Sequence, residues 1–429
     1  MIFRFFERLF VVLVLLACMH VFIALANPDL GEDDPDAVST QLHMSTVLVD
    51  GGVYACGALL ILMRLKKFAR AARAAWPILA LPLLAMLSAA WSAEPELTFR
   101  RGLFLLFSTL LAVYLGERYS MDKLARLTAQ TMCLMMTAVI ALYFVAPAYV
   151  IDYSSHAGDL KGLSTHKNPF GEYMAVAFLL LLLVRFRHFA WLRYVFLALA
   201  GGMLLLSHSA AALACCALSV AAMPMWSWFR LSRRQRLLMC TISLVLVAGA
   251  VYFALNHSEL LLHALGRNAT FSGRTQLWAT LWPAILRRPV LGYGYQTFWA
   301  GLQGEALNAR IGLNWLASAA DNGYIDLCLS LGFTGAIAFL ALFVRFFRQA
   351  IAYLRTERGP LGLWPVTYFF FFAVHNVAES TLLARATFSF LAFAMIATSL
   401  AVSRYRAVSA SQPEQIQEIP FDDGVVLAG

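Results

Sequence analysis

Long apolar runs separated by short polar turns fill most of this sequence. Each run has about 16–22 residues, enough for a helix to cross the hydrocarbon core of a bilayer with some tilt. The pattern therefore predicts an all-α polytopic membrane protein with about twelve transmembrane helices. The runs lie near residues 9–26, 45–63, 76–92, 102–117, 126–146, 169–184, 190–206, 210–227, 237–255, 323–344, 361–377 and 387–403.

A polar stretch over residues 256–322 interrupts this pattern before the tenth predicted helix. Long loops carried on a rigid scaffold hold function more often than their length requires, so we expect the chemistry here. We expect one transmembrane domain over residues 1–406 and a polar, disordered tail over residues 407–429. The loop contains the motifs Gly266-Arg267, Ser272-Gly273-Arg274, Arg287-Arg288-Pro289, Gly292-Tyr293-Gly294 and Asp321-Asn322-Gly323.

The composition agrees with a membrane protein and excludes an ordinary soluble domain. The chain is 61% hydrophobic and 13% charged, with a mean hydropathy of +0.71. Soluble domains normally carry about 25% charged residues. The seven cysteines lie in or beside apolar runs and form no CxxC or CxxH pair, so we expect neither a disulfide framework nor a metal site, and no cofactor.

The distribution of lysine and arginine predicts the orientation. With both termini in the cytoplasm, 23 of the 33 basic residues fall on the inner side, as the positive-inside rule requires. The net charge of +9 then reflects topology and anionic lipid, and nucleic acid is not expected as a partner. Ten cations remain outside and indicate an anionic ligand, unless they are solvated loop charges: Arg100, Arg101, Lys161, Lys167, Arg267, Arg274, Arg287, Arg288, Arg310 and Arg385.

Within the loop, residues 275–286 predict a helix with Trp278 and Trp282 on its apolar face and Arg274 at its start. The pattern fits a helix in the headgroup layer and equally one that covers the bundle. Gly292-Tyr293-Gly294 is interpreted as a turn, because it lacks the flanking features of a phosphate loop.

Further candidates precede the loop. His166-Lys167-Asn168 stands before Pro169 at a predicted helix start, a natural site for an anion. The adjacent Arg100 and Arg101 suit a diphosphate. Ser207-His208-Ser209 is interpreted as a hairpin turn rather than as a nucleophilic serine. Ionisable residues inside apolar runs are suspected of function, and these are Asp50, Glu172, Asp326 and His375.

In combination, these motifs resemble the O-antigen ligase and polymerase superfamily, in its exopolysaccharide-production polymerase (ExoQ-like) branch. The resemblance covers the whole chain and rests on several stretches in order: Trp91-Ser92 with Arg100-Arg101, Gly162 with His166-Lys167-Asn168 and Gly171, Ser207-His208-Ser209, Gly266-Arg267, Ser272-Gly273-Arg274-Thr275 with Trp278, Arg288-Pro289 with Gly292-Tyr293-Gly294, and Asp321-Asn322-Gly323 with Gly332 and Gly335.

The resemblance implies a GT-C-like fold and a metal-independent inverting glycosyltransferase that uses an undecaprenyl-diphosphate-linked donor. Relatives have a His-Asn pair, proposed to activate the acceptor hydroxyl, where this chain has Asp321-Asn322. The base is then Asp321 with a raised pKa, or His375 or His166, or the position only orients the acceptor. Arg274 joins Asp321 as catalytic, and the implied diphosphate- and substrate-binding residues are Arg100, Arg101, His166, Lys167, Asn168, Arg267, Arg288, Trp278 and Asn322.

The first hypothesis for function is a polysaccharide polymerase that adds lipid-linked oligosaccharide repeat units to an exopolysaccharide or O-antigen chain at the outer face of the bacterial inner membrane. The alternative with the same chemistry is an O-antigen ligase that acts on lipid A-core or another acceptor. A lipid-linked oligosaccharide transporter is the alternative of another class, and the absence of symmetric broken helices disfavours it. Expected partners are the undecaprenyl-diphosphate-linked oligosaccharide, membrane lipids, a flippase and chain-length or export proteins.

Overall fold

A computed structural model describes residues 2–26, 44–153, 158–186, 189–231, 274–301, 304–311 and 317–410, together with four single positions. The predicted helix over residues 237–255, the first part of the polar loop with Arg267, and most of the tail lie outside the described residues. In the part that is described, the fold is all-helical, and an isolated β-bridge between Ile151 and Leu160 is its one pairing of extended backbone. The single domain over residues 1–406 stays a prediction.

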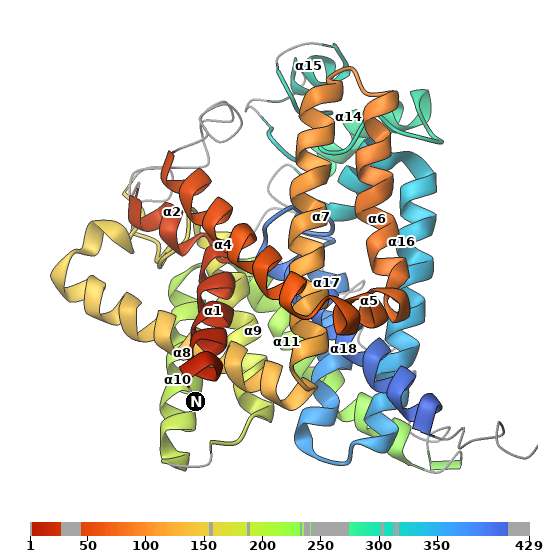
Figure 1. Ribbon diagram of the computed structural model, residues 1–429. Helices are drawn as coiled ribbons and strands as arrows, with labels where there is room; N and C mark the ends of the chain where they lie inside the picture. Colours follow the sequence, from red (N-terminus) through yellow and green to blue (C-terminus); the bar gives the residue numbers. More distant parts are fainter. Residues whose placement is uncertain are drawn as a thin grey trace, which may run out of the picture.

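Fifteen α-helices are described (Figure 1). They are α1 (Ile2–Cys18), α2 (Val21–Ala26), α4 (Met44–Met63), α5 (Leu65–Ala74), α6 (Trp76–Leu87), α7 (Pro95–Arg118), α8 (Met121–Val145), α9 (Lys167–Leu183), α10 (Ala190–Leu206), α11 (Ala210–Ser227), α14 (Arg274–Arg287), α15 (Gly304–Ile311), α16 (Gly323–Thr356), α17 (Trp364–His375) and α18 (Phe388–Ala410). Short 3-10 turns η1 (Ser88–Ala90), η2 (Pro147–Tyr149), η3 (Trp228–Arg230) and η5 (Pro360–Leu363) connect some of them.

Five described helices are long and apolar enough to cross a membrane. They are α7, α8, α11 continued by η3, α16 and α18. The pair of α5 and the segment Trp76–Ala90, bent by 86°, makes a sixth if it is counted as one span. A membrane protein built from helices is thus confirmed, and the count of twelve stays a prediction.

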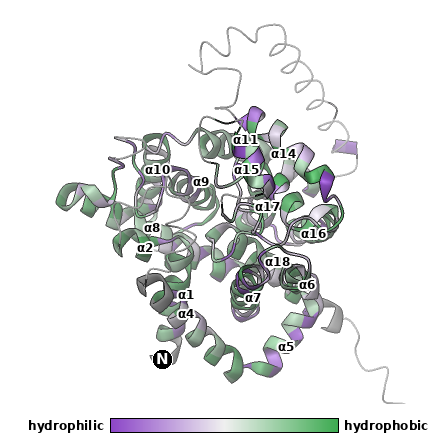
Figure 2. Ribbon diagram, turned by 90° about the horizontal axis from the view of Figure 1, so that it is seen from above, coloured by the Kyte–Doolittle hydropathy of each residue, from purple (hydrophilic) through white to green (hydrophobic). Residues whose placement is uncertain are grey.

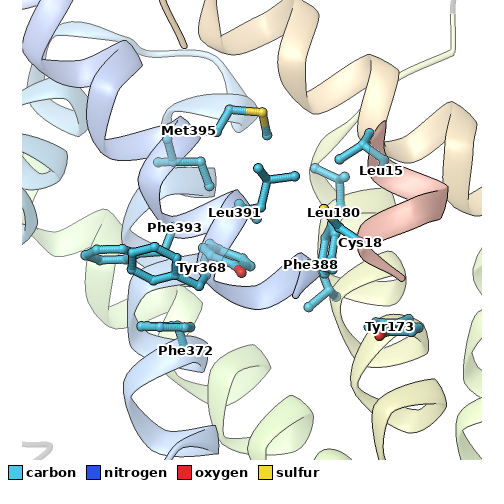
Figure 3. Close-up of a cluster of buried hydrophobic side chains, with 14 of the residues drawn as sticks. Leu15, Cys18, Tyr173, Leu180, Tyr368, Phe372, Phe388, Leu391, Phe393 and Met395 are labelled. Atoms are coloured by element: carbon cyan, nitrogen blue, oxygen red, sulfur yellow. The ribbon is translucent and has the colours of Figure 1, made fainter. Parts of the chain in front are cut away.

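Aromatic side chains of α17 and α18 form the centre of the core. Phe393 lies 5.0 Å from Phe372 between ring centroids, and Tyr173 of α9 packs edge-on against Phe388 at 5.8 Å. Figure 3 shows this cluster together with Leu15 of α1 and Leu180 of α9, so four helices far apart in the sequence meet there. At Gly116 of α7 an added Cβ would lie 2.7 Å from the Met395 carbonyl, which is why α7 can pack so closely against α18.

A break in α16 fixes the polar loop to the bundle. Gly332 has φ 63° and ψ −167°, and an added Cβ would meet the Val290 carbonyl oxygen at 2.2 Å. The break frees backbone groups that the segment after α14 satisfies: Tyr293 N–H donates to the Leu329 carbonyl at 2.8 Å, and Phe333 N–H donates to the Pro289 carbonyl at 2.7 Å. The predicted turn at residues 292–294 is therefore held against α16 by main-chain hydrogen bonds.

Long-range contacts define two ends of the bundle. Trp91, just before α7, donates its indole N–H to the Leu291 carbonyl at 2.9 Å, so α7 begins where α14 ends. Arg230 of η3 donates to the Glu357 carbonyl at 2.9 Å, so α11 ends where α16 ends. We call the first the loop end and the other the opposite end. Figure 1 shows α14 and α15 over the ends of α6, α7 and α16 at the top of the view.

Candidate functional site

Arg274, the first residue of α14, lies between two carboxylates at the loop end. Its Nε donates to Asp321 Oδ2 at 3.2 Å and its Nη2 donates to Glu379 Oε1 at 3.3 Å. Asp321 precedes α16, and Glu379 belongs to the segment between α17 and α18, so one guanidinium joins three parts of the chain. The Arg274 side chain is 18% exposed and that of Asp321 is 35% exposed, which leaves the pair open to a ligand from one side. We call these three residues the Arg274 cluster.

Asn322 is the N-cap of α16 and a structural joint. Its Oδ1 accepts from the N–H groups of Tyr324 at 3.0 Å and Ile325 at 3.2 Å, and its Nδ2 donates to the Val377 carbonyl at 3.1 Å. A capping asparagine satisfies helix N–H groups that otherwise lack partners. At Gly323 an added Cβ would lie 2.3 Å from Asn376 Oδ1, so only glycine fits there. The Asp-Asn-Gly motif thus fixes Asp321, with φ 48°, at the start of α16.

The helix α14 covers the loop end of the bundle. Its residues Leu277 and Leu281 are buried against Phe298 and Leu329. Trp278 points inward and donates to the Ala320 carbonyl at 2.9 Å, whereas Trp282 is 54% exposed. Trp278 therefore supports the backbone next to Asp321, and Trp282 is the aromatic side chain that α14 presents to its surroundings.

Asp326 accepts hydrogen bonds that hold the backbone next to Asp321 and Asn322 in place. Its Oδ1 accepts from the Trp299 indole N–H at 2.8 Å, and its Oδ2 accepts from Ala320 N–H at 3.0 Å and from the Ser380 hydroxyl. The Ser380 hydroxyl also accepts from Asn322 N–H at 3.1 Å. These three donors occupy the hydrogen-bonding capacity of the Asp326 side chain. Asp326 therefore serves to position the start of α16 around Asn322.

Two arginines, Arg101 and Arg385, bind Gln296, and the charge of Arg100 acts on both; we call these three residues the arginine group. Arg101 donates to the Gln296 carbonyl, and Arg385 donates to its side-chain Oε1 at 2.8 Å. Arg101 is buried, whereas its neighbour Arg100 is exposed. Burial, and to a smaller extent the positive charge of Arg100, lower the pKa of Arg385 below its ordinary value.

The arginine group has no ion pair with a carboxylate among the described residues. Like charges held together in a desolvated place are unfavourable unless an anion joins them. The Arg274 cluster, by contrast, already contains two carboxylates for one cation. The arginine group is therefore the better anion site of the two.

A small cavity of about 40 Å³ lies between these two clusters. Gln296, the partner of Arg101 and Arg385, lines it on one side. Gly323 and Ser380, which support Asp321, line it on the other. The arrangement brings Arg274 and Arg101 to one region of the loop end, although they share no direct contact. The cavity is too small for a sugar residue, so a glycan has to bind at its surface or open it.

A third group lies at the start of α9. Asp159 Oδ2 accepts from Lys167 Nζ at 2.7 Å, and its Oδ1 lies 2.6 Å from His208 Nδ1. Burial raises the pKa of Asp159, but the hydrogen bonds from Lys167 and His208 lower it more, so it lies below its ordinary value. His208 is 64% exposed in the turn between α10 and α11, and the Ser207-His208-Ser209 motif is the turn that the sequence predicts.

His166 and Asn168 have local roles in the same group. The His166 side chain caps α9, with Nδ1 accepting from Asn168 N–H at 3.3 Å. His166 is only 6% exposed, whereas Lys167 points to Asp159. Part of the predicted anion site at His166-Lys167-Asn168 therefore serves to begin α9. In this group the exposed histidine is His208.

His375 and Arg288 share no hydrogen bond or ion pair with the Arg274 cluster or the arginine group among the described residues, although His375 is close enough to feel the charge of Arg274. His375 is 1% exposed, stacks on Phe371 at 5.2 Å, and neither ring nitrogen makes a hydrogen bond to any described residue. Its Nδ1 is 4.0 Å from Glu172 Oε1, which accepts a hydrogen bond from the Ser389 hydroxyl. Arg288 is exposed and lies over the Tyr293 ring at 5.0 Å.

Sequence reasoning left four residues of these clusters out of the site: Asp159, Gln296, Glu379 and Arg385. The signal for Arg385 was present, because it is one of the ten cations expected on the outer side. Nothing in the local sequence distinguishes Gln296, Asp159 or Glu379, since each acquires its role from a partner at least eight positions away.

Two comparisons with known proteins bear on this site. The model of a family described as O-antigen ligase matches residues 195–340, a range that includes His208, Arg274, Gln296 and Asp321. The chain is also 30% identical over 111 residues to the exopolysaccharide production protein ExoQ of Rhizobium meliloti (strain 1021). That match covers 24% of this chain and 24% of the relative, so the two are compared over about a quarter of their lengths.

Proposed function

We propose that this protein, whose resemblance to the O-antigen ligase and polymerase superfamily and its ExoQ-like branch is supported by both matches, is a polysaccharide polymerase. It transfers undecaprenyl-diphosphate-linked oligosaccharide repeat units to a growing exopolysaccharide or O-antigen chain at the outer face of the inner membrane. The observation that carries the proposal is the arginine group near the Arg274 cluster, in which three cations form no ion pair within the described chain and Asp50 is a more distant carboxylate that acts on Arg385.

The proposed reaction needs two things from the protein. An acceptor hydroxyl oxygen attacks the anomeric carbon of the donor sugar, and the bond from that carbon to the diphosphate oxygen breaks with its electron pair. The lipid diphosphate leaves with an added negative charge, and the hydroxyl proton passes to a base. The protein therefore has to stabilise the leaving diphosphate and to hold the acceptor next to a proton acceptor.

The arginine group suits the diphosphate. Arg101 donates to the main-chain carbonyl of Gln296 and Arg385 to its side-chain oxygen, so both guanidinium groups are oriented before a ligand binds. Arginine forms paired hydrogen bonds with phosphate oxygens. Burial, and after it the charge of Arg100, lower the pKa of Arg385, and a bound anion would offset both effects.

The Arg274 cluster suits the acceptor. In this structure Asp321 forms an ion pair with Arg274 at 3.2 Å. If the departing diphosphate draws the guanidinium toward its own charge, Asp321 loses its counter-ion and can accept the hydroxyl proton. Asp321 thereby takes the place of the histidine found in relatives, and Asn322 holds it at the start of α16.

His208 is the competing base. In the tautomer that donates Nδ1–H to Asp159, the other ring nitrogen is left as a hydrogen-bond acceptor, and the side chain is 64% exposed. Asp321 is preferred because it lies beside the cavity that adjoins the arginine group, and a base has to be near the reacting atoms before its acidity matters.

Purified protein incubated with lipid-linked repeat units, with the products resolved by size, tests the proposal. A ladder of products differing by one repeat unit is the expected result. A single transfer to a different acceptor would indicate a ligase, and transport across vesicles without a new glycosidic bond would indicate a transporter; either would replace the polymerase.

A further inference from the structure

A second basic site lies at the opposite end of the bundle. A cavity of about 360 Å³ opens there between α5 and the last turns of α7 and α18. We call this cavity the basic pocket. It is lined by the carboxylate Glu117 and by five cations: Arg64, Lys67, Arg70, Arg118 and Arg406. Arg101 and Glu117 are 16 positions apart on α7, about 24 Å at 1.5 Å per residue, so the basic pocket is separate from the arginine group.

The cations of the basic pocket exceed its carboxylate charge. Glu117 pairs with Arg64 and with Arg406, each at 3.4 Å. Arg118 is used elsewhere, because it binds Glu7 through two hydrogen bonds at 2.9 and 2.5 Å. Four cations therefore share one carboxylate.

Two of these cations have unused hydrogen-bonding capacity toward an anion. Lys67 and Arg70 have no ion pair with any carboxylate in the described chain. An oxygen-rich anion in the pocket would offer acceptors to the N–H groups of both side chains.

The surroundings indicate that the pocket opens at a membrane surface. The helix α5 turns 86° away from the segment Trp76–Ala90, which is apolar enough to be part of a span. A helix perpendicular to a spanning helix lies along the membrane surface, and Figure 2 shows hydrophilic residues on α5. Leu62, Met63 and Leu65, at the junction of α4 and α5, are each more than half exposed. Such apolar side chains beside a basic pocket fit acyl chains next to headgroups.

The basic pocket has an apolar wall and a polar wall. Ala71, Ala74 and Val402 give it an apolar side, and the cations give it a polar side. A small free anion would use only the polar side. The glycerol and acyl portions of a phospholipid would contact the apolar side while the phosphate meets the cations.

We propose that the basic pocket binds the phosphate headgroup of an anionic phospholipid. The bound lipid joins α5 to the ends of α7 and α18, in addition to the two 3.4 Å pairs of Glu117 and the buried contact of Ala71, Val113 and Val402. This site does not depend on the proposed function, because it uses none of the residues of the Arg274 cluster or the arginine group.

The test uses the full-length protein purified in a neutral detergent. Phosphatidylglycerol is titrated while the thermal unfolding midpoint and, by native mass spectrometry, the retained lipid are measured. Phosphatidylcholine and inorganic phosphate are titrated separately under the same conditions. We expect phosphatidylglycerol to raise the midpoint and remain bound, and the other two to have little effect.

Two paired variants make the assignment specific. Lys67→Gln with Arg70→Gln removes two pocket cations but keeps the pairs of Glu117, and should weaken phosphatidylglycerol binding about 10-fold. Arg345→Gln with Arg348→Gln removes two exposed cations of α16 that do not line the pocket, and should leave binding within about twofold of the unmodified protein. Equal binding of phosphatidylcholine, an equal effect of inorganic phosphate, or equal weakening in both variants would overturn the proposal.

Discussion

The Arg274 cluster and the arginine group lie at the same end of the bundle and differ in their charge balance. Arg274 is enclosed by two carboxylates, Asp321 and Glu379, at 3.2 and 3.3 Å. Arg101 and Arg385 meet at an uncharged glutamine instead. A cation that already has its counter-ions holds parts of the chain together, whereas cations without them are ready for an anion from outside. Our proposal that the acceptor binds at the first cluster and the diphosphate at the second rests on this difference.

The largest effect is expected from Arg274→Ala, because it removes the cation and leaves two carboxylates facing each other. Loss of one oriented donor lowers kcat by about 10²- to 10³-fold, and the unpaired carboxylates add to that loss. The measurement is polymer synthesis by purified enzyme from lipid-linked repeat units. Arg287→Ala is the matched control, because it removes an exposed arginine of the same helix that pairs with Glu305.

Protein level and bound lipid-linked donor should stay normal in the Arg274→Ala membranes. Polymer of normal amount and length from this variant would contradict a role in the reaction. If the variant does not accumulate, Arg274→Lys preserves the charge and allows the same measurement.

Asp321→Asn sharpens the division of roles. It keeps the size of the side chain and removes its ability to take the acceptor proton, so kcat should fall about 10²-fold while the donor KM changes little. His208→Asn is the comparison, because it removes the competing base, and it should lower kcat less than about threefold. If the two variants exchange these effects, His208 is the base and Asp321 only positions Arg274.

The arginine group should affect donor binding more than turnover. In Arg101→Gln with Arg385→Gln, the loss of charged hydrogen bonds to a phosphate should raise the donor KM by about 10- to 100-fold. Steady-state kinetics with varied donor concentration measures it. Arg287→Gln is the control, because it removes an exposed arginine outside the group. Arg310→Gln is less suitable, since the Arg310 side chain is buried and donates to the Trp299 and Gly301 carbonyls. An unchanged donor KM would remove the diphosphate from this group.

The smallest effect is expected from Asp159, whose pKa in the folded protein lies below its ordinary value. A lowered carboxylate pKa stabilises the folded state above the pKa of the unfolded chain, and this stabilisation disappears as the pH falls through the folded-state pKa. The thermal midpoint of the unmodified protein should therefore fall toward that of Asp159→Asn between about pH 5 and pH 3. A constant difference between the two proteins over this range would show that the charge of Asp159 contributes no stability.

The sequence by itself determined the helical membrane architecture, because run length and apolar character are local properties of the chain. It also indicated α14 with Arg274 at its start, the turn around His208 and the adjacent Arg100 and Arg101. Each of these depends on neighbours within a few positions. The start of α16 at Gly323 agrees with the predicted run to the residue.

Only the tertiary structure decided which of these residues meet. Arg274 finds partners 47 and 105 positions away, and Gln296 joins arginines 195 and 89 positions away. It also decided that His375 is buried without a hydrogen bond to the described chain, and that the segment after α14 pairs with the break at Gly332. Ion pairs and hydrogen bonds act over about 3–4 Å, and spacing along a chain does not fix a distance across the loops between its helices.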